Sequence, residues 1–182
     1  RPVPERPPAD RAGEAALRAE LARREQAAFE QTAEALREAL RNDPRLAEVA
    51  QQVLIETVPE GLRIQLLEAD GQPMFALGGG QPTERARALI RRVSDAAQRL
   101  PNPLTVTGHT DSTPFRAGGR TNWDLSAERA NATRRLLQEA GIPDARLRGV
   151  TGMADREPLL PDRPTDAGNR RVAITLLREA TP

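Results

Sequence analysis

The sequence contains no cysteine, one histidine and one tryptophan, and only 2% of its 182 residues are aromatic. The absence of cysteine excludes disulfides, thiolate metal sites and thiol catalysis. The scarcity of aromatic residues predicts a core built from leucine, isoleucine, valine and alanine. A single histidine is a poor start for a zinc site, which needs about three protein ligands. We therefore expect neither a metal nor a cofactor.

The sequence also lacks a strong excess of either charge and any long apolar run. Its formal net charge is +1. This balance gives no general attraction to nucleic acid or anionic lipid, so nucleic acid is not an expected partner. No apolar run approaches the length of a membrane span, and no signal peptide is visible. Because the sequence begins at Arg1 rather than at methionine, we expect a fragment or a processed chain.

The first third of the chain is rich in proline and then in alanine. Four prolines fall within the first eight residues, so residues 1–9 are predicted to form an extended linker. Residues 10–52 are predicted to form a helical segment, whose long helix stops at Asn42-Asp43-Pro44. Its apolar stripe is thin: Leu17, Leu21, Ala28, Phe29, Ala33, Leu36 and Leu40.

This thin stripe has two interpretations. The helix is either a solvated helix with one weakly packed face, or a helix that packs on a partner subunit or detaches under regulation. In both cases the stripe buries little area, so we expect weak docking compared with the core.

Residues 53–182 read as one α+β domain, in which strands and helices alternate. The expected elements are a hairpin at 53–67, a helix from 82 to 100, a strand from 104, a helix from 126 to 140, and strands at 146–151 and 171–177. This order predicts a mixed sheet with helices packed on one face, a two-layer α/β sandwich, preceded by the N-terminal helical extension.

A polar stretch between the strand at 104 and the next helix carries the chemistry. Gly108 ends the alternating apolar run, and a polar cluster leads to Asp111. Ser126 is a suitable N-cap for the following helix, which places Arg129 in its first turn. A carboxylate and a guanidinium therefore frame one loop, either as a simple salt bridge or as a binding pair.

Catalysis explains this loop less well than binding. Ser112 lies near His109 but not in the strained elbow of a hydrolase nucleophile, and His109 is better explained as a packed or hydrogen-bonded ring. Asp111 and Asp124 are formally available as the two carboxylates of a glycosidase. We expect no enzyme activity.

Four motifs in order resemble those of OmpA-like peptidoglycan-binding domains: Gly108-His109-Thr110-Asp111, Asn122 with Leu125-Ser126, Arg129-Ala130, and Asn169-Arg170-Arg171-Val172. The resemblance covers roughly Gly61 to Leu177. Within that family, the chain is most similar to the periplasmic part of flagellar stator subunits of the MotB type. The narrower likeness rests on residues 112–121, 122–131 and 151–154.

The resemblance implies a non-catalytic cell-wall anchor that binds the stem peptide of peptidoglycan, most often through diaminopimelate. That residue ends in an ammonium and a carboxylate on one carbon. In the family, the positions of Asp111 and Arg129 carry this recognition, with Asp111 accepting the ammonium and Arg129 forking onto the carboxylate. Thr110, Asn122 and Arg170 are further candidate contacts.

The MotB-type likeness also implies partners and a location. It implies a homodimer, and a MotA-like channel subunit reached through a membrane helix missing from this chain. It places this part in the periplasm, anchored in the inner membrane by that helix. The alternative is a Pal-type or OmpA-type envelope anchor unrelated to the flagellar motor.

Overall fold

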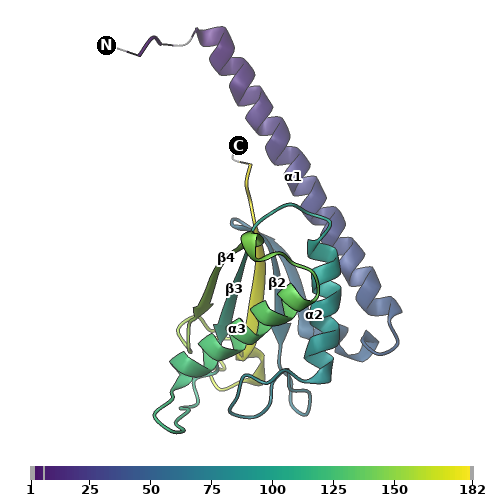
Figure 1. Cartoon of the computed structure of the whole chain (residues 1–182), viewed down its shortest axis with the longest axis vertical. Coiled ribbons are helices and arrows are strands. Elements are labelled where there is room, and N and C mark those ends of the chain that lie inside the picture. Colours follow the sequence, from purple (N-terminus) through teal and green to yellow (C-terminus); the bar gives the residue numbers. More distant parts are fainter. Residues whose placement is uncertain (1–2, 6, 181–182) are drawn as a thin grey trace.

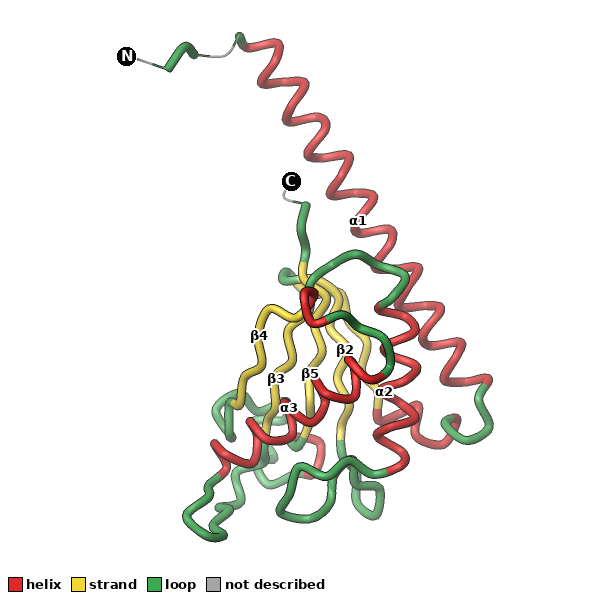
Figure 2. Tube along the Cα trace, in the orientation of Figure 1, coloured by secondary structure: helices red, strands yellow, loops and turns green. Residues whose placement is uncertain are grey.

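A mixed sheet of five strands forms the centre of the structure, a computed structural model that describes residues 3–5 and 7–180. Figures 1 and 2 show its place beside the helices. Its strands are β1 (Val53–Val58), β2 (Gly61–Leu67), β3 (Leu104–His109), β4 (Leu147–Gly152) and β5 (Arg171–Leu177). They lie in the order β1-β2-β5-β3-β4. Only the β3–β4 pair is parallel, and the other neighbours are antiparallel.

The described residues form three α-helices, α1 (Pro8–Asn42), α2 (Glu84–Ala97) and α3 (Asn122–Glu139). Helices α2 and α3 and the second half of α1 pack on one face of the sheet. Short 3-10 turns occupy Ala47–Gln52, Asp144–Arg146 and Ala167–Asn169. Alternate strand residues, such as Leu62, Ile64 and Ile174, enter the common core with the helices, as the period-2 pattern requires. The predicted α+β sheet with helices on one face is confirmed, including its N-terminal helix.

The start of α3 differs from the prediction. Thr121, not Ser126, is the N-cap, because Thr121 and Asp124 form a capping box that satisfies the free N–H groups at this end. Arg129 therefore lies in the second turn. Ser126 is instead a bridge between elements: its hydroxyl donates to the Trp123 carbonyl at 3.0 Å and accepts from the Ala154 amide at 3.0 Å.

Gly108 does not end β3, as the sequence suggested, but lies within it. The strand continues to His109. Because Gly108 has no side chain, α3 crosses the sheet very closely at this point. A Cβ atom at Gly108 would lie 2.1 Å from the carbonyl oxygen of Ser126. This close crossing fixes the distance between α3 and the sheet, and it therefore fixes the position of Arg129 relative to the end of the sheet.

Helix α1 divides into a free half and a packed half (Figure 1). In the second half, Phe29, Leu36 and Leu40 are at most 2% exposed and belong to the common core. In the first half, Leu17 and Leu21 are 60% and 46% exposed. The expectation of weak docking along residues 10–41 is therefore wrong for the second half. No helix in the described part of the chain, α1 included, has the length and apolar character of a membrane span.

Glu25 marks the boundary between the two halves of α1. Its carboxylate accepts hydrogen bonds from the Asn102 amide at 3.0 Å and from the backbone N–H of Glu179 at 2.9 Å. Just beyond it, the Arg178 guanidinium lies 5.4 Å from the centre of the Phe29 ring. The segment that follows β5 thus fastens the middle of α1 to the domain.

This division predicts two rates of hydrogen exchange within one helix. Amides of residues 10–24 should exchange early, because few tertiary contacts oppose local opening there. Amides of residues 29–40 should exchange at rates close to those of α2 residues 89–97, with which they share a core. Mass-spectrometric hydrogen exchange would measure both. Uniformly fast exchange along all of α1 would show that its second half is not an integral part of the fold.

Candidate functional site

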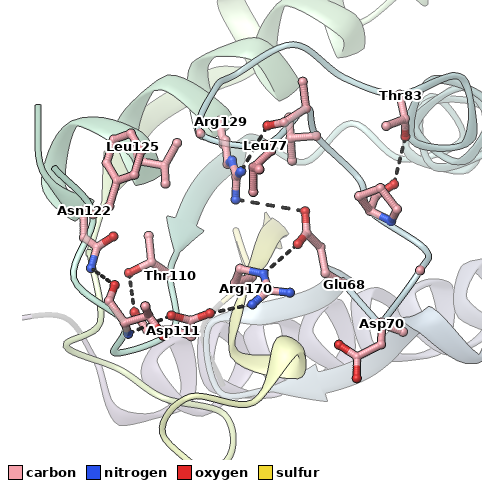
Figure 3. Close-up of a pocket in the computed structure, with 18 of the residues that line it drawn as sticks. Glu68, Asp70, Leu77, Thr83, Thr110, Asp111, Asn122, Leu125, Arg129 and Arg170 are labelled. Atoms are coloured by element: carbon pink, nitrogen blue, oxygen red, sulfur yellow. Dashed lines mark hydrogen bonds and ion pairs between the residues drawn. The ribbon is translucent and has the colours of Figure 1, made fainter. Parts of the chain in front are cut away.

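A cleft of about 600 Å³ lies where β2 and β3 end and β5 begins (Figure 3). Strand register places these ends together, since Arg171 pairs with both Leu67 and His109. The adjacent residues Glu68, Thr110 and Arg170 therefore converge at one end of the sheet. The lining residues are Glu68, Ala69, Asp70, Gly71, Pro73, Phe75, Ala76, Leu77, Gly78, Thr83, Thr110, Asp111, Thr113, Pro114, Phe115, Asn122, Leu125, Arg129 and Arg170.

Arg170 holds two carboxylates at the base of the cleft. Its Nη1 lies 2.5 Å from Asp111 Oδ2, and its Nε lies 2.7 Å from Glu68 Oε2. Burial alone would lower the pKa of Arg170, but the hydrogen bonds with Glu68 and Asp111 outweigh it and raise the pKa. Asp111 is fixed further by the Thr113 amide, which donates to Oδ1 at 2.8 Å. The positive charge of Arg170 and the backbone N–H of Thr113 thus hold these carboxylates in fixed positions before any ligand binds.

Arg129 reaches the cleft from α3 and is held by backbone carbonyls. Its Nε donates to Gly79 at 3.0 Å and its Nη2 to Ala76 at 3.4 Å, while the guanidinium lies 5.3 Å from the centre of the Phe75 ring. The Nη1 atom lies 4.0 Å from Glu68 Oε1. That is an ion pair without a hydrogen bond, so one donor group still faces the cleft.

Burial makes the Arg129 guanidinium a strong attractor for an anion. The side chain is 7% exposed. Burial is the main cause that lowers its pKa, opposed by the nearby Glu68 carboxylate. A positive charge that has lost its water interacts more strongly with an incoming carboxylate than an exposed charge does. The cleft therefore offers a desolvated cation beside a cluster of carboxylates.

Thr110 and Asn122 shape the cleft rather than carry its charge. The Thr110 hydroxyl donates to the carbonyl of Asp111 at 2.9 Å. The Asn122 side chain donates to the carbonyl of Thr113 at 3.0 Å, so it braces the loop after β3. Both line the cleft together with Asp111, Arg129 and Arg170. All five residues singled out in the sequence are thus gathered at one cleft.

The charge pairing itself differs from the simplest sequence-based alternative. Asp111 and Arg129 form no direct salt bridge in the described part of the chain. Asp111 instead pairs with Arg170, and Arg129 pairs with Glu68. Glu68 was missed by sequence reasoning, which ended the first hairpin at residue 67. The sequence signal that could have identified Glu68 is its position: it is an acidic residue directly after a strand, at the same end of the sheet as Asp111.

The groups considered for catalysis do not meet in this cleft. His109 points to the opposite face of the sheet, where it lines a separate groove. Asp124 caps α3 by accepting from the Thr121 amide at 2.9 Å, and it is not among the cleft-lining residues. The pair of carboxylates required by a glycosidase is therefore not presented here by Asp111 and Asp124.

Known proteins resemble this chain in sequence and in fold. The sequence model of the OmpA family matches residues 74–171. Motility protein B of Escherichia coli K12 is 36% identical over 142 residues, which cover 77% of this chain and 46% of that protein. The chain thus spans about half the length of the curated relatives it matches.

Two solved structures extend the comparison. The cell wall anchor of the T6SS from Pseudomonas aeruginosa is 28% identical with a TM-score of 0.62, covering 77% of this chain and 97% of that chain. The periplasmic domain of Helicobacter pylori MotB, 22% identical with a TM-score of 0.61, covers 70% of this chain and 89% of that chain, and it shares the fold.

Proposed function

Because this chain belongs to the OmpA family, we propose that it is a non-catalytic anchor that binds peptidoglycan in the cleft between Asp111 and Arg129. The observation that carries the proposal is the cleft's charge pattern. A buried guanidinium with a donor facing the cleft lies near two fixed carboxylates. The resemblance to the cell wall anchor from Pseudomonas aeruginosa supports the same role.

The proposed ligand group is the zwitterionic end of diaminopimelate in the stem peptide. Its carboxylate would accept from Arg129, whose Nη1 has no hydrogen bond within the described residues. Its ammonium would donate to Asp111, whose two oxygens are already oriented by Arg170 and by the Thr113 amide. Charge-assisted hydrogen bonds of this kind are about twice as strong as neutral ones.

We propose further that this anchor fixes a flagellar stator to the cell wall. The 36% identity with Motility protein B supports this assignment. On this proposal the chain lies in the periplasm. A helix outside this sequence attaches it to the inner membrane, and that helix contacts a MotA-like channel subunit. The second candidate is an envelope anchor unrelated to the flagellar motor, and the similarity to the T6SS anchor is the observation that supports it.

Binding to purified sacculi would test the proposed function. Asp111→Asn should reduce the co-sedimenting fraction, corresponding to roughly a tenfold or greater loss of affinity, because it removes the ammonium's charged partner. Asp155→Asn is the matched control, since Asp155 pairs with Arg156 outside the cleft. Wild-type protein should release no muropeptides from the sacculi. Equal sedimentation of both variants would rule out the assigned site.

We also propose that the chain forms a homodimer, as the MotB-type likeness implies. The exposed Leu17 and Leu21 on the free half of α1 offer an apolar contact for a second copy. Light scattering on the purified chain should give about twice the 19.9 kDa chain mass at high concentration. The double variant Leu17→Ser, Leu21→Ser should shift the equilibrium toward monomer. A wild-type chain that stays monomeric with α1 intact would contradict this proposal.

A further inference from the structure

A second groove, of about 250 Å³, lies on the face of the sheet that carries no helix. Side chains of β2, β3 and β5 that alternate with the core residues line it, and the small Ala173 leaves room above the sheet. The lining residues are Val58, Glu60, Arg63, Gln65, Thr105, Thr107, His109, Glu157, Arg171, Ala173, Thr175 and Leu177. The proposed peptidoglycan cleft does not use this groove.

Arg171 places a buried positive charge in this groove without a paired carboxylate. The residue is 9% exposed. Its three nitrogens donate only to neutral oxygens, namely the Gln65 amide at 2.7 Å, the Asn169 carbonyl at 3.2 Å and the Glu157 carbonyl at 2.7 Å. No carboxylate in the described chain lies within 4.0 Å of it. An unpaired buried charge is costly, which makes this guanidinium a ready partner for an anion.

Two further side chains of the groove each have one buried polar atom without a hydrogen bond. Nδ1 of His109 and Nε of Arg63 are buried atoms without a hydrogen bond in the described residues. His109 is 5% exposed, and the Arg63 guanidinium pairs with the Glu56 carboxylate through Nη2 at 3.5 Å. Buried polar atoms are almost always satisfied. Arg63 Nε is a donor without an acceptor, and His109 Nδ1 can donate to an oxyanion in the tautomer that carries its proton there.

The pKa shifts of the groove residues agree with this geometry. Burial, then the positive charges of Arg171 and Arg63, lower the pKa of His109 to about 4. Burial, then Arg63, lowers the pKa of Arg171 to about 10, against the opposing effect of Glu157. Glu60 and Glu157 line the groove without pairing with Arg171, while Glu56 pairs with Arg63. The Arg63 and Arg171 guanidinium groups thus repel each other, and both disfavour the charged form of His109.

We propose that this groove binds a small oxyanion, a phosphate or a carboxylate group, through Arg63, His109 and Arg171. The threonine hydroxyls of Thr105, Thr107 and Thr175 line the same groove and supply further donors. Cationic and apolar ligands do not fit this lining, whose central groups are basic and polar. The site is separate from the proposed peptidoglycan cleft, so its occupancy does not depend on that proposal.

The single histidine of the chain makes a direct assay possible, because its ring signals need no assignment. Inorganic phosphate and, separately, acetate would be titrated into the full chain while the His109 ring is followed by NMR. At least one of the two anions should shift these signals saturably and raise the pKa of His109 from about 4, since a bound anion stabilises the imidazolium. The tighter anion identifies the ligand class. No saturable shift with either anion up to about 50 mM, a concentration well above millimolar dissociation constants, would overturn the proposal.

Arg63→Gln is the test variant, because Arg63 is partly exposed and lies outside the apolar core. It should weaken binding of the better anion roughly ten- to hundredfold, as expected when one charged partner is lost. Without anion it should also raise the pKa of His109, since one repelling charge is removed. Arg148→Gln on the exposed surface of β4 removes the same charge and should leave binding unchanged. Equal loss in both variants would indicate nonspecific charge attraction and would also overturn the site.

Discussion

Arg129→Ala is expected to reduce the affinity for sacculi roughly ten- to hundredfold, the effect of losing a desolvated charged contact. Arg129 is expected to have a larger effect than any other cleft side chain, because it both faces the ligand and holds the carbonyls of Ala76 and Gly79. Its removal therefore loses the anion partner and loosens the loop that closes the cleft. Co-sedimentation at several sacculus concentrations would measure the change.

Arg129→Lys separates the two contributions. Lysine keeps the charge but lacks the planar fork that donates to two carbonyls and a ligand together. We expect intermediate affinity, with the wild-type circular dichroism spectrum for both variants. Wild-type affinity of Arg129→Ala would show that the ligand does not use this guanidinium.

Gly108→Ala is expected to destabilise the fold by roughly 3 kcal/mol, near the upper end for an overpacked site. The added Cβ would lie 2.1 Å from the carbonyl oxygen of Ser126 and 2.9 Å from its carbonyl carbon. These are backbone atoms, so α3 must move away from β3 to relieve the contact. Thermal unfolding should show a decrease in Tm of about 10 °C, given about 2–4 °C per kcal/mol for a chain of this size.

Gly149→Ala provides the matched control. A Cβ atom at Gly149, on the neighbouring strand β4, would meet nothing within 4 Å. Its effect should stay within about 0.5 kcal/mol, as for a typical surface substitution. Because α3 carries Arg129, Gly108→Ala should also weaken sacculus binding at temperatures where the protein remains folded. Equal stability of the two variants would mean that α3 adjusts to the sheet without cost.

Periodicity was sufficient to predict most of the fold. The final strand, with Val172, Ile174 and Leu176 on one face, begins and ends as expected. The start of α3 was misplaced because Ser126 and Thr121 are both acceptable caps. The choice between them depends on Asp124, whose carboxylate completes the capping box with Thr121. Capping strength, not periodicity, decided that boundary.

The site was only partly predictable, because its charge pairing depends on strand register. Asp111, Arg129 and Arg170 were identified from motifs in sequence order. Glu68 belongs to no such motif, and it is brought to Arg170 by the pairing of Leu67 with Arg171. A sequence alone specifies which faces of a strand are buried, but not which residue of another strand lies opposite. The role of Glu68 therefore emerged only from the assembled sheet.

The two halves of α1 could not be separated from sequence for a related reason. Its apolar residues form one continuous stripe, and nothing local distinguishes Leu21 from Leu36. The difference comes from distant segments. Asn102 and the backbone N–H of Glu179 fasten the helix at Glu25, and beyond that point α2 and the sheet cover it.

The free half of α1 lies at the opposite end of the molecule from the loops that follow β2 and β3 (Figure 1), and residues of these loops line the cleft. A pull between the first turn of α1 and a ligand held in the cleft would act roughly along the strands. The hydrogen bonds that join β5 to β2 and β3 would then be loaded together, in shear, rather than opened one after another. The fastening at Glu25 has only a few hydrogen bonds. Under tension the domain would therefore yield first at the junction with α1, and the sheet that holds the cleft would stay intact.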